Sequence, residues 1–380
     1  MPPGGKRLNT QKPGRRDAHD VIVVGAGLVG AAVAARLTEE GLDTAIFEAR
    51  YVTGGATGRS LGVAFLGLAG HYSWAVSVYG RQQAREIWAL TAGGRGRLVE
   101  AAARLAVPVQ RTGSIALAVD EEEADLLWES VNLLREDGYQ ASFSLTDPLG
   151  RGFEGALRRP GDATVDTAAL TRALLKGVGV VVHEGAEVYA LEPVGDRIRV
   201  WAHGRDAVCR FVVLAINGYA ALIDPYLSER VKPVPSLVFS TDPLSDPILD
   251  QPCTVDHGRA TIRSLPDGRL LVGLQRRPGF PTDAGPVDDP TMQVVLGHLP
   301  ELQLRSGDSW SEMTGVTPDG LPLLGSLPGM PQVYFAVGFN GRGLSWAFVA
   351  AERLVNAMLR DGGLGLLSAN RLDRRDSSSA

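Results

Sequence analysis

Three glycines near the start of the chain have the spacing of a phosphate-binding turn. Gly25, Gly27 and Gly30 lie in the stretch DVIVVGAGLVGAAVAARLTEEGLDTAIFEAR, which begins at Asp20. In such a turn the first glycine permits a sharp bend, the second lets a pyrophosphate approach the backbone, and the third lets helix and strand pack closely. The free N–H groups of the following helix face the anion. The pattern predicts a bound dinucleotide.

An acidic residue follows these glycines at the distance expected of a ribose-binding group. Glu48 closes the run DTAIFE, about 20 residues after the first glycine. Its carboxylate can accept hydrogen bonds from ribose hydroxyls, and it favours an adenosine ribose that carries no phosphate. The acid does not distinguish NAD from FAD.

A second glycine-rich turn lies far along the chain. GFNGRG, residues 338–343, separates an apolar run from a long helical pattern. It would direct a second helix N-terminus toward the first site. A flavin ring becomes anionic on reduction and benefits from this positive end, whereas an NAD enzyme needs only one such unit. The second turn therefore favours FAD, the alternative being a glycine-rich surface loop before an ordinary helix.

Few side chains suggest substrate chemistry. His71 could take a proton from a substrate ammonium, and His257 precedes a predicted strand. A structural or surface histidine is the alternative at both positions. Trp310 could form a wall of the substrate pocket or belong to the core. The two cysteines, Cys209 and Cys253, have no metal-ligand spacing, and we expect buried thiols there and no metal site.

Composition argues against several classes of protein. The net charge of −5 argues against nucleic acid or an anionic membrane as the main partner. No apolar run reaches the roughly 18 residues of a spanning helix, so we expect no membrane span. Two cysteines far apart in sequence fit a reducing compartment, and we expect a cytoplasmic protein.

Strands and helices alternate at both ends of the chain, where they would position the two turns. The strand 20–24, a helix over 28–40 and the strand 43–48 form a β-α-β unit. Residues 332–359 repeat this order of strand, turn and helix. Between them, 231–300 alternates in the manner of antiparallel strands. Other helices and strands are predicted over residues 75–107, 121–138, 167–177, 178–193 and 210–220.

The chain resembles the FAD-dependent D-amino-acid oxidase superfamily, which includes glycine oxidase, sarcosine oxidase and γ-glutamylputrescine oxidase. The resemblance extends from about Asp20 to Met358. Besides the two glycine-rich turns and Glu48, it rests on the segments GGATGRS (54–60), GDATVDTAALTRALL (161–175), EVYALEP (187–193), VVLAINGYA (212–220), DGRLLVG (267–273) and TPDGLPLLG (317–325).

The resemblance implies a two-domain fold. An α/β FAD-binding domain of the Rossmann-like, glutathione-reductase type is paired with an α+β substrate domain whose antiparallel sheet covers the flavin. We expect the FAD-binding domain to be discontinuous, because nucleotide-binding elements lie at both ends of the chain. The predicted boundaries are 20–85, 150–220 and 310–362 for the FAD-binding domain, 86–149 and 221–309 for the substrate domain, and 1–19 and 363–380 for disordered tails.

The resemblance also implies which residues hold FAD. The first turn would hold the pyrophosphate, Glu48 the adenosine ribose, and residues 57–60 the middle of the cofactor. The backbone of Val188 would meet the adenine, and residues 340–343 the pyrimidine side of the flavin. The complete expected set is Gly25, Ala26, Gly27, Leu28, Val29, Gly30, Glu48, Ala49, Arg50, Thr57, Gly58, Arg59, Ser60, Val188, Ala215, Gly338, Asn340, Gly341, Arg342, Gly343 and Leu344.

One departure from the family pattern concerns how a substrate carboxylate is held. Glycine-oxidase-like members place an arginine for this purpose at the position aligned with Thr314. The bidentate grip of an arginine is therefore missing there. Members of the γ-glutamylputrescine type resemble this stretch better and oxidise an amine without that clamp. The arginines that could substitute are Arg263, Arg276, Arg277 and Arg342.

Two further departures concern the flavin and the oxidant. The cysteine to which sarcosine oxidases attach flavin aligns with Glu312, which excludes covalent attachment by that route and leaves FAD non-covalently bound. The lysine thought to promote the reaction with oxygen aligns near Leu271. The electron acceptor is therefore open between O2 and another molecule.

These observations lead to an expected activity. The protein would oxidise a C–N bond of a small-molecule amine or amino acid by hydride transfer to flavin N5, giving an imine that water hydrolyses. His71 and Arg342 are the candidate catalytic residues, and Trp310, Thr314 and His257 the candidates for substrate binding. An FAD-dependent 2-hydroxy-acid or polyol dehydrogenase, and a non-catalytic FAD-binding subunit of a larger dehydrogenase, stay open as alternatives. The oligomeric state is not predicted.

Overall fold

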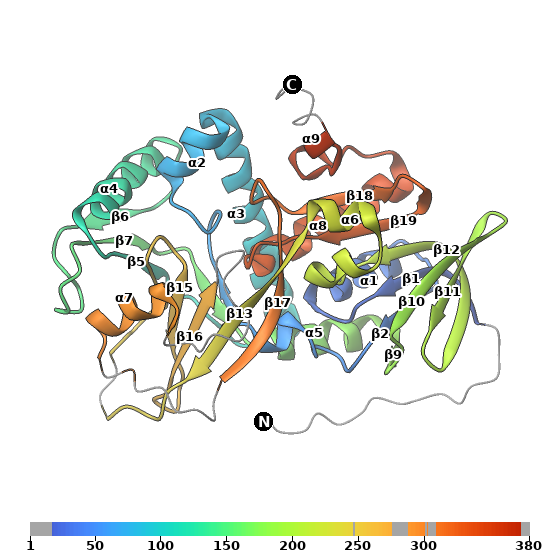
Figure 1. The fold of residues 1–380 in the computed structure, drawn as a ribbon, viewed down its shortest axis with the longest axis horizontal. Helices are drawn as coiled ribbons and strands as arrows, with labels where there is room; N and C mark the ends of the chain where they lie inside the picture. The colour runs from blue at the N-terminus through green and yellow to red at the C-terminus, as the bar shows by residue number, and fades with distance from the viewer. Residues whose placement is uncertain (1–16, 246–247, 276–287, 301, 303–308, 374–380) are drawn as a thin grey trace.

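A computed structural model describes residues 17–245, 248–275, 288–300, 302 and 309–373. Within these ranges the strands form two large sheets and one small sheet (Figure 1). The helices of eight or more residues are α1 (Leu28–Glu39), α2 (Tyr72–Tyr79), α3 (Arg81–Arg104), α4 (Glu121–Glu136), α5 (Thr167–Val178), α7 (Pro290–His298) and α8 (Gly343–Arg360). The shorter helices are η1 (Ala56–Arg59), η2 (Asn217–Leu222), α6 (Pro225–Arg230), η4 (Gly365–Leu367) and α9 (Asn370–Asp373).

The first large sheet is mostly parallel, and both glycine-rich turns follow its strands. Its order is β10-β11-β12-β1-β2-β9, while β19 pairs with β12 and β18 pairs with β19. The pairs of β1 with β2 and β12, of β2 with β9 and of β12 with β19 are parallel. The strands are β1 (Asp17–Val24), β2 (Thr44–Glu48), β9 (Val181–Glu184), β10 (Val188–Val194), β11 (Arg197–Ala202), β12 (Arg205–Leu214), β18 (Leu323–Leu327) and β19 (Met330–Val337).

Strand β1 is buried on both faces of this sheet. Val21 and Val23 belong to the core shared with α1, α3 and α8, whereas Ile22 and Val24 belong to the core on the opposite face. A strand covered on both sides must be apolar at every position, which explains its continuous apolar run. The predicted β-α-β unit is therefore present, with α1 connecting β1 to β2.

The second large sheet is antiparallel except for one pair. Its order is β17-β13-β16-β15-β14-β5-β7-β6, and β14 runs parallel to β5. Helix α7 covers one face of it. The strands are β5 (Ser114–Ala118), β6 (Ser142–Ser144), β7 (Gly155–Arg159), β13 (Lys232–Ser240), β14 (Cys253–Val255), β15 (Ala260–Ser264), β16 (Leu270–Gln275) and β17 (Ser309–Val316). The predicted combination of an α/β unit with an antiparallel sheet is thus confirmed.

The two sheets meet in the middle of the molecule. Strands β13 and β17 cross the centre of Figure 1, between the first sheet on the right and the remaining strands of the second sheet on the left. The small sheet, of β3 (Val63–Ala64), β4 (Val109–Gln110) and β8 (Ala163–Val165), joins segments far apart in sequence. Among the described residues, no helix combines the length and apolarity that crossing a membrane requires.

Two strands lie in a different sheet from the other strands of their predicted domain. Strands β7 and β17 fall in ranges assigned to the FAD-binding domain, but both are hydrogen-bonded in the second sheet. The reason is that β7 pairs with β5 and β17 pairs with β13 along their lengths. The boundaries between the two domains stay a prediction.

The predicted tails are also shorter than expected. Residues 17–19 extend β1 and pair with β12, while the remainder of the N-terminal tail lies outside the described residues. At the other end, Leu367 and Leu372 are buried, and Arg371 donates hydrogen bonds to both carboxylate oxygens of Asp319 at 2.7 and 2.9 Å. These contacts attach the chain to the rest of the protein as far as residue 373. The residues beyond 373 lie outside the described part.

A glycine lets α3 approach the first turn of α8 closely. A Cβ atom at Gly94 would lie 1.9 Å from the carbonyl oxygen of Ser345, a distance no side chain can occupy. The adjacent Gly93 is exposed. Among the described residues, apart from its chain neighbours and the backbone of its own helix, no atom lies within 4 Å of the position that a Cβ would take. The start of α8 is therefore positioned by backbone contact with α3.

Replacing these two neighbouring glycines by alanine should have opposite effects. Gly94→Ala should lower the free energy of unfolding by about 1–3 kcal/mol, because the helices must separate. Gly93→Ala should raise it by about 0.5–1 kcal/mol, because alanine favours a helix and contacts nothing there. Urea unfolding of both variants measures the difference, and equal effects would contradict the close contact between α3 and α8.

Candidate functional site

The first glycine-rich turn has the geometry that its spacing predicts. Gly25 has a φ of +105°, and its Cβ would lie 2.8 Å from the carbonyl oxygen of Ala215. Gly27 precedes α1 and places no side chain over the start of the helix, where the structure shows no side-chain cap. At Gly30 a Cβ would lie 2.0 Å from the carbonyl oxygen of Gly25. The three glycines thus place no side chain of their own at a helix N-terminus suited to bind an anion.

Glu48 lies beside this turn at the end of β2. Its Oε2 accepts a hydrogen bond from the N–H of Ala26 at 2.8 Å, and its Oε1 accepts one from the N–H of Arg50 at 2.9 Å. Residue 48 is 9% exposed. The carboxylate is therefore held in a fixed orientation between the turn and the end of β2, as a ribose-binding group requires.

The segment after β2 packs over the same turn through η1. Thr57 Oγ1 accepts a hydrogen bond from the N–H of Leu28 at 3.0 Å, and Arg59 donates hydrogen bonds to the carbonyls of Gly54 and Gly55. Residues 49 and 50 are exposed. The remaining predicted contacts Val29, Gly58 and Val188 lie at the start of α1, in η1 and at the start of β10.

The second glycine-rich turn brings the start of α8 to the pocket described below. Gly338 has a φ of +71° and Asn340 a φ of +51°. The side chain of Asn340 forms hydrogen bonds to the protein backbone. Its Oδ1 accepts the N–H of Thr317 at 2.9 Å, and its Nδ2 donates to the carbonyl of Gly338 at 2.7 Å. Helix α8, like α1, has no side-chain cap at its N-terminus.

A pocket lies between the start of α8 and the second sheet. Its wall includes strand β3, the turn between β14 and β15, and one face of the strands β13, β15, β16 and β17. Four predicted FAD contacts contribute to it, namely Ser60, Gly341, Arg342 and Leu344. The other residues that matter for its chemistry are Phe65, Ser236, Arg259, Gln275 and Glu312.

Arg342 brings a positive charge to this pocket. Its guanidinium lies 4.3 Å from the centroid of the Phe65 ring, a distance typical of a cation–π contact. Burial, together with the nearby charge of Arg159, lowers the pKa of Arg342 to about 9. Arg159 forms an ion pair with Asp162 at 3.3 Å, whereas among the described residues no carboxylate is hydrogen-bonded to Arg342. The pocket therefore contains a cation suited to an anionic ligand.

Glu312 brings an acid to the same pocket. It lies on β17 opposite Ser236 of β13. Its Oε2 is buried and has no hydrogen-bond partner among the described residues. Burial raises the pKa of Glu312 to about 7, although the charge of Arg59 acts in the opposite direction. A carboxyl in this state can bind a cation or exchange a proton near neutral pH.

Two predicted substrate-binding residues on β17 form hydrogen bonds to other residues of the protein. Thr314 is 2% exposed, and its Oγ1 lies 3.0 Å from Oγ of Ser236. Trp310 donates a hydrogen bond from Nε1 to the carbonyl of Arg59 at 3.1 Å. Neither lines the pocket. They connect β17 to β13 and to η1.

Four arginines could replace the missing arginine that binds a substrate carboxylate. Of the two that lie in the described residues, Arg342 lines the pocket. Arg263 donates a hydrogen bond from Nη1 to the carbonyl of Leu61 at 2.6 Å and does not line the pocket. Arg276 and Arg277 lie outside the described residues. Arg259 lines the pocket but is paired with Asp256 at 2.8 Å.

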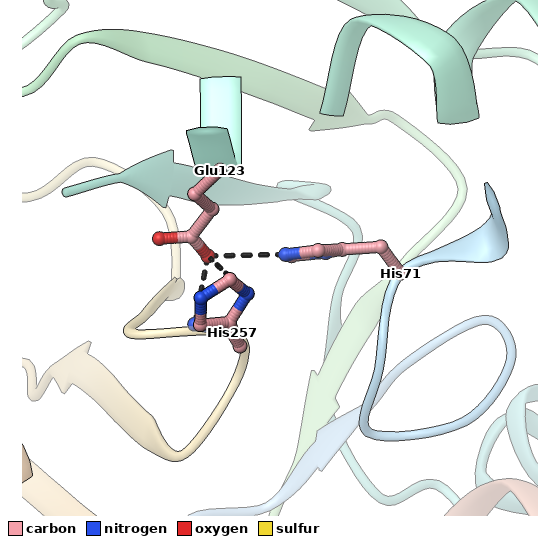
Figure 2. Close-up of side chains that lie close together, drawn as sticks. All are labelled: His71, Glu123 and His257. Atoms are coloured by element: carbon pink, nitrogen blue, oxygen red, sulfur yellow. Dashed lines mark hydrogen bonds and ion pairs between the residues drawn. The ribbon is translucent and has the colours of Figure 1, made fainter. Parts of the chain in front are cut away.

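The structure does not place His71 and His257 among the pocket-lining residues. Both lie next to Glu123 instead (Figure 2). His71 Nε2 is 3.1 Å from Glu123 Oε1, which also accepts the backbone N–H of His257 at 2.7 Å. The predicted catalytic role of His71 and substrate-binding role of His257 therefore find no support in the pocket.

Sequence reasoning missed several residues that define the site. Glu312 entered it only as the residue that replaces a cysteine, and Phe65 was not singled out. A charged residue within the strand SWSEMTGV, at Glu312, was the available signal. Nothing in the sequence indicated that Phe65 would contact Arg342 or that Glu123 would meet two histidines, because these contacts form only in the folded chain.

Comparison with known proteins agrees with this geometry. Residues 20–357 match the family model described as DAO, FAD dependent oxidoreductase. A glycine oxidase of Geobacillus kaustophilus is 27% identical over 378 residues, which cover 95% of this chain and 94% of that protein. A probable oxidoreductase, OrdL, of Haemophilus influenzae is 24% identical over 366 residues, which cover 90% of this chain and 83% of that protein.

A solved structure shows the same fold. The crystal structure of L-proline dehydrogenase from P. horikoshii matches with a TM-score of 0.77 at 19% identity, covering 95% of this chain and 99% of that chain. The family match spans the two uncapped helix ends, Glu48 and the pocket between them and the second sheet. The chain therefore belongs to the DAO family of FAD-dependent oxidoreductases, and it is an enzyme whose cofactor is FAD.

Proposed function

We propose that this enzyme oxidises a C–N bond of an amine or amino acid. The observation that supports the proposal most directly is the pocket that combines the cation of Arg342 with the acid of Glu312. The relatives named glycine oxidase lend support, because glycine is oxidised at its C–N bond. The absence of an arginine at Thr314 favours an amine held by its nitrogen over a substrate held by its carboxylate.

The residues present fit FAD at this position. The N-cap residues of α1 and α8 make no side-chain cap, and Gly25, Gly27 and Gly30 place no Cβ atom at the first turn. The first of these ends would hold the pyrophosphate and Glu48 the ribose, while residues 341–344 would contact the flavin. When bound, FAD supplies a two-electron acceptor. Cys209 and Cys253 are 0% exposed and do not line the pocket, which supports non-covalent binding.

The side chains would act by position and charge. Arg342, buried against Phe65, offers a positive charge that stabilises the negative charge that develops on reduction. Glu312, when ionised, accepts hydrogen bonds from the ammonium of the substrate and orients the adjacent C–H bond. The substrate then loses one proton from nitrogen and one hydride from carbon, and water converts the resulting imine to a carbonyl compound.

An anaerobic screen of flavin reduction tests this proposal. We expect amines or amino acids to bleach the absorption of the bound flavin, and 2-hydroxy acids and polyols to leave it unchanged. Bleaching by hydroxy acids alone would favour the dehydrogenase of that class. No bleaching by any compound, with a tightly co-purifying partner, would favour a non-catalytic subunit. Reoxidation in air then distinguishes O2 from another acceptor. The cytoplasmic location stays a prediction.

Glu48→Gln should weaken FAD binding. The amide keeps the size of the side chain but loses the charge that strengthens hydrogen bonds to ribose hydroxyls, so the Kd for FAD should rise about 10-fold or more. Titration of apoprotein with FAD, followed by flavin fluorescence, measures it. Glu39→Gln, at an exposed position of α1, is the control. An unchanged Kd for the Glu48 variant would remove the ribose-binding role.

Glu312→Gln should abolish a pH dependence in substrate binding. Because the pKa of Glu312 is raised to about 7, its carboxyl is mostly protonated at pH 6 and mostly ionised at pH 8. The Kd of a cationic amine, measured by anaerobic stopped-flow reduction, should therefore fall about 10-fold between pH 6 and pH 8. In the glutamine variant it should stay at the higher value throughout. The same pH profile in both proteins would show that Glu312 does not bind the substrate cation.

A further inference from the structure

Three side chains from distant parts of the chain meet outside the FAD pocket (Figure 2). His71 immediately precedes α2, Glu123 lies in the first turn of α4, and His257 lies in the turn between β14 and β15. We call them the His-Glu-His cluster. One potential ligand atom of each residue lies within 4.8 Å of the others. The sequence predicts no metal site here, because these residues share no local motif.

The cluster is shielded on one side and open on the other. The side chains of His71 and Glu123 are 7% and 1% exposed, whereas that of His257 is 36% exposed. Glu123 Oε2 accepts the N–H of Val119 at 3.1 Å, and this bond fixes the plane of the carboxylate. The other oxygen, Oε1, lies between the two imidazole rings, whose centroids are 5.5 Å apart.

The distances fit the edges of a metal-centred tetrahedron. Two ligand atoms with metal bonds of about 2.0–2.1 Å at tetrahedral angles lie roughly 3.3 Å apart. His71 Nε2 is 3.1 Å from Glu123 Oε1, and His257 Nδ1 is 3.8 Å from the same oxygen. These two separations lie on either side of the ideal edge. The three ligand atoms lie within 4.8 Å of one another, and rotation of the imidazole rings would be needed to bring all three to bonding distance from one ion.

The turn that bears His257 is held in an uncommon conformation. Asp256 and His257 have φ values of +53° and +52°, a backbone region that residues other than glycine rarely adopt. The turn is fixed by two hydrogen bonds, from Arg259 N to the Asp256 carbonyl at 2.9 Å and from Thr291 Oγ1 to Asp256 Oδ2 at 2.6 Å. This conformation directs the imidazole of His257 toward Glu123.

We propose that the His-Glu-His cluster binds a divalent transition-metal ion of the zinc class. Two imidazoles and one carboxylate are a typical zinc ligand set, and the open side toward His257 leaves a fourth position for water. The ion would connect α2, α4 and the β14–β15 turn. Gly258 and Arg259 of that turn line the FAD pocket, so the metal would hold part of the pocket wall in place. The proposal does not depend on the substrate of the enzyme.

Calorimetric titration of the untagged, chelator-treated holoprotein with Zn²⁺ tests the proposal. We expect one ion to bind per chain and the thermal midpoint of unfolding to rise with Zn²⁺. Glu123→Gln keeps the size of the side chain and one of its two acceptor oxygens, which can serve the N–H of either Val119 or His257. It loses the charge, and should weaken binding by about 100-fold or more. His257→Asn should also weaken binding, and asparagine tolerates the positive φ of this position.

A second histidine–glutamate pair, elsewhere on the molecule, provides the control. His203 Nδ1 lies 3.8 Å from Glu187 Oε2, and both side chains are exposed. The double variant Glu187→Gln, His203→Asn should bind Zn²⁺ as the wild type does. Loss of one site in the Glu123 and His257 variants alone would support the proposal. No binding by the wild type, or equal binding by all variants, would overturn it and identify the cluster as a hydrogen-bonded contact without metal.

Discussion

The buried positive charge of Arg342 is the constraint on which the chemistry of this protein depends. A guanidinium removed from water loses its hydration, and burial of a charge is tolerated only where attraction compensates for that loss. The ring of Phe65 supplies part of this attraction. The charge of Asp162 supplies a further part, and a negatively charged ligand in the pocket would add to it. The cation, the helix end and the second sheet therefore define one site.

The position of Arg342 depends in turn on close backbone packing. Helix α8 begins one residue later, and its first turn contacts α3 where Gly94 has no side chain. Asn340 then fixes the preceding turn through Thr317 and Gly338. The same principle operates at the first turn, where Gly30 lies against the carbonyl of Gly25. Small residues thus position both helix ends, and Glu312 on β17 lines the same pocket as Arg342.

Much of this fold could be predicted from the sequence because the signals are local. The apolar run of β1, the glycines after it and the helix that follows form a unit whose geometry is set within 30 residues. The buried acid at Glu312 and the meeting of Glu123 with two histidines could not be predicted, since each depends on strands or helices far apart in sequence. The contact of Arg371 with Asp319 near the C-terminus could not be predicted for the same reason.

The most direct measurement is a product analysis after a single anaerobic turnover. A substrate that reduces the flavin is mixed with the enzyme in stoichiometric amount, and the products are quantified together with the reduced flavin. If a C–N bond of an acyclic substrate is oxidised, we expect one carbonyl compound and one ammonia or amine to be released for each flavin reduced. Flavin reduction by an acyclic substrate without release of nitrogen would contradict the proposed reaction, because the oxidised bond would then not be C–N.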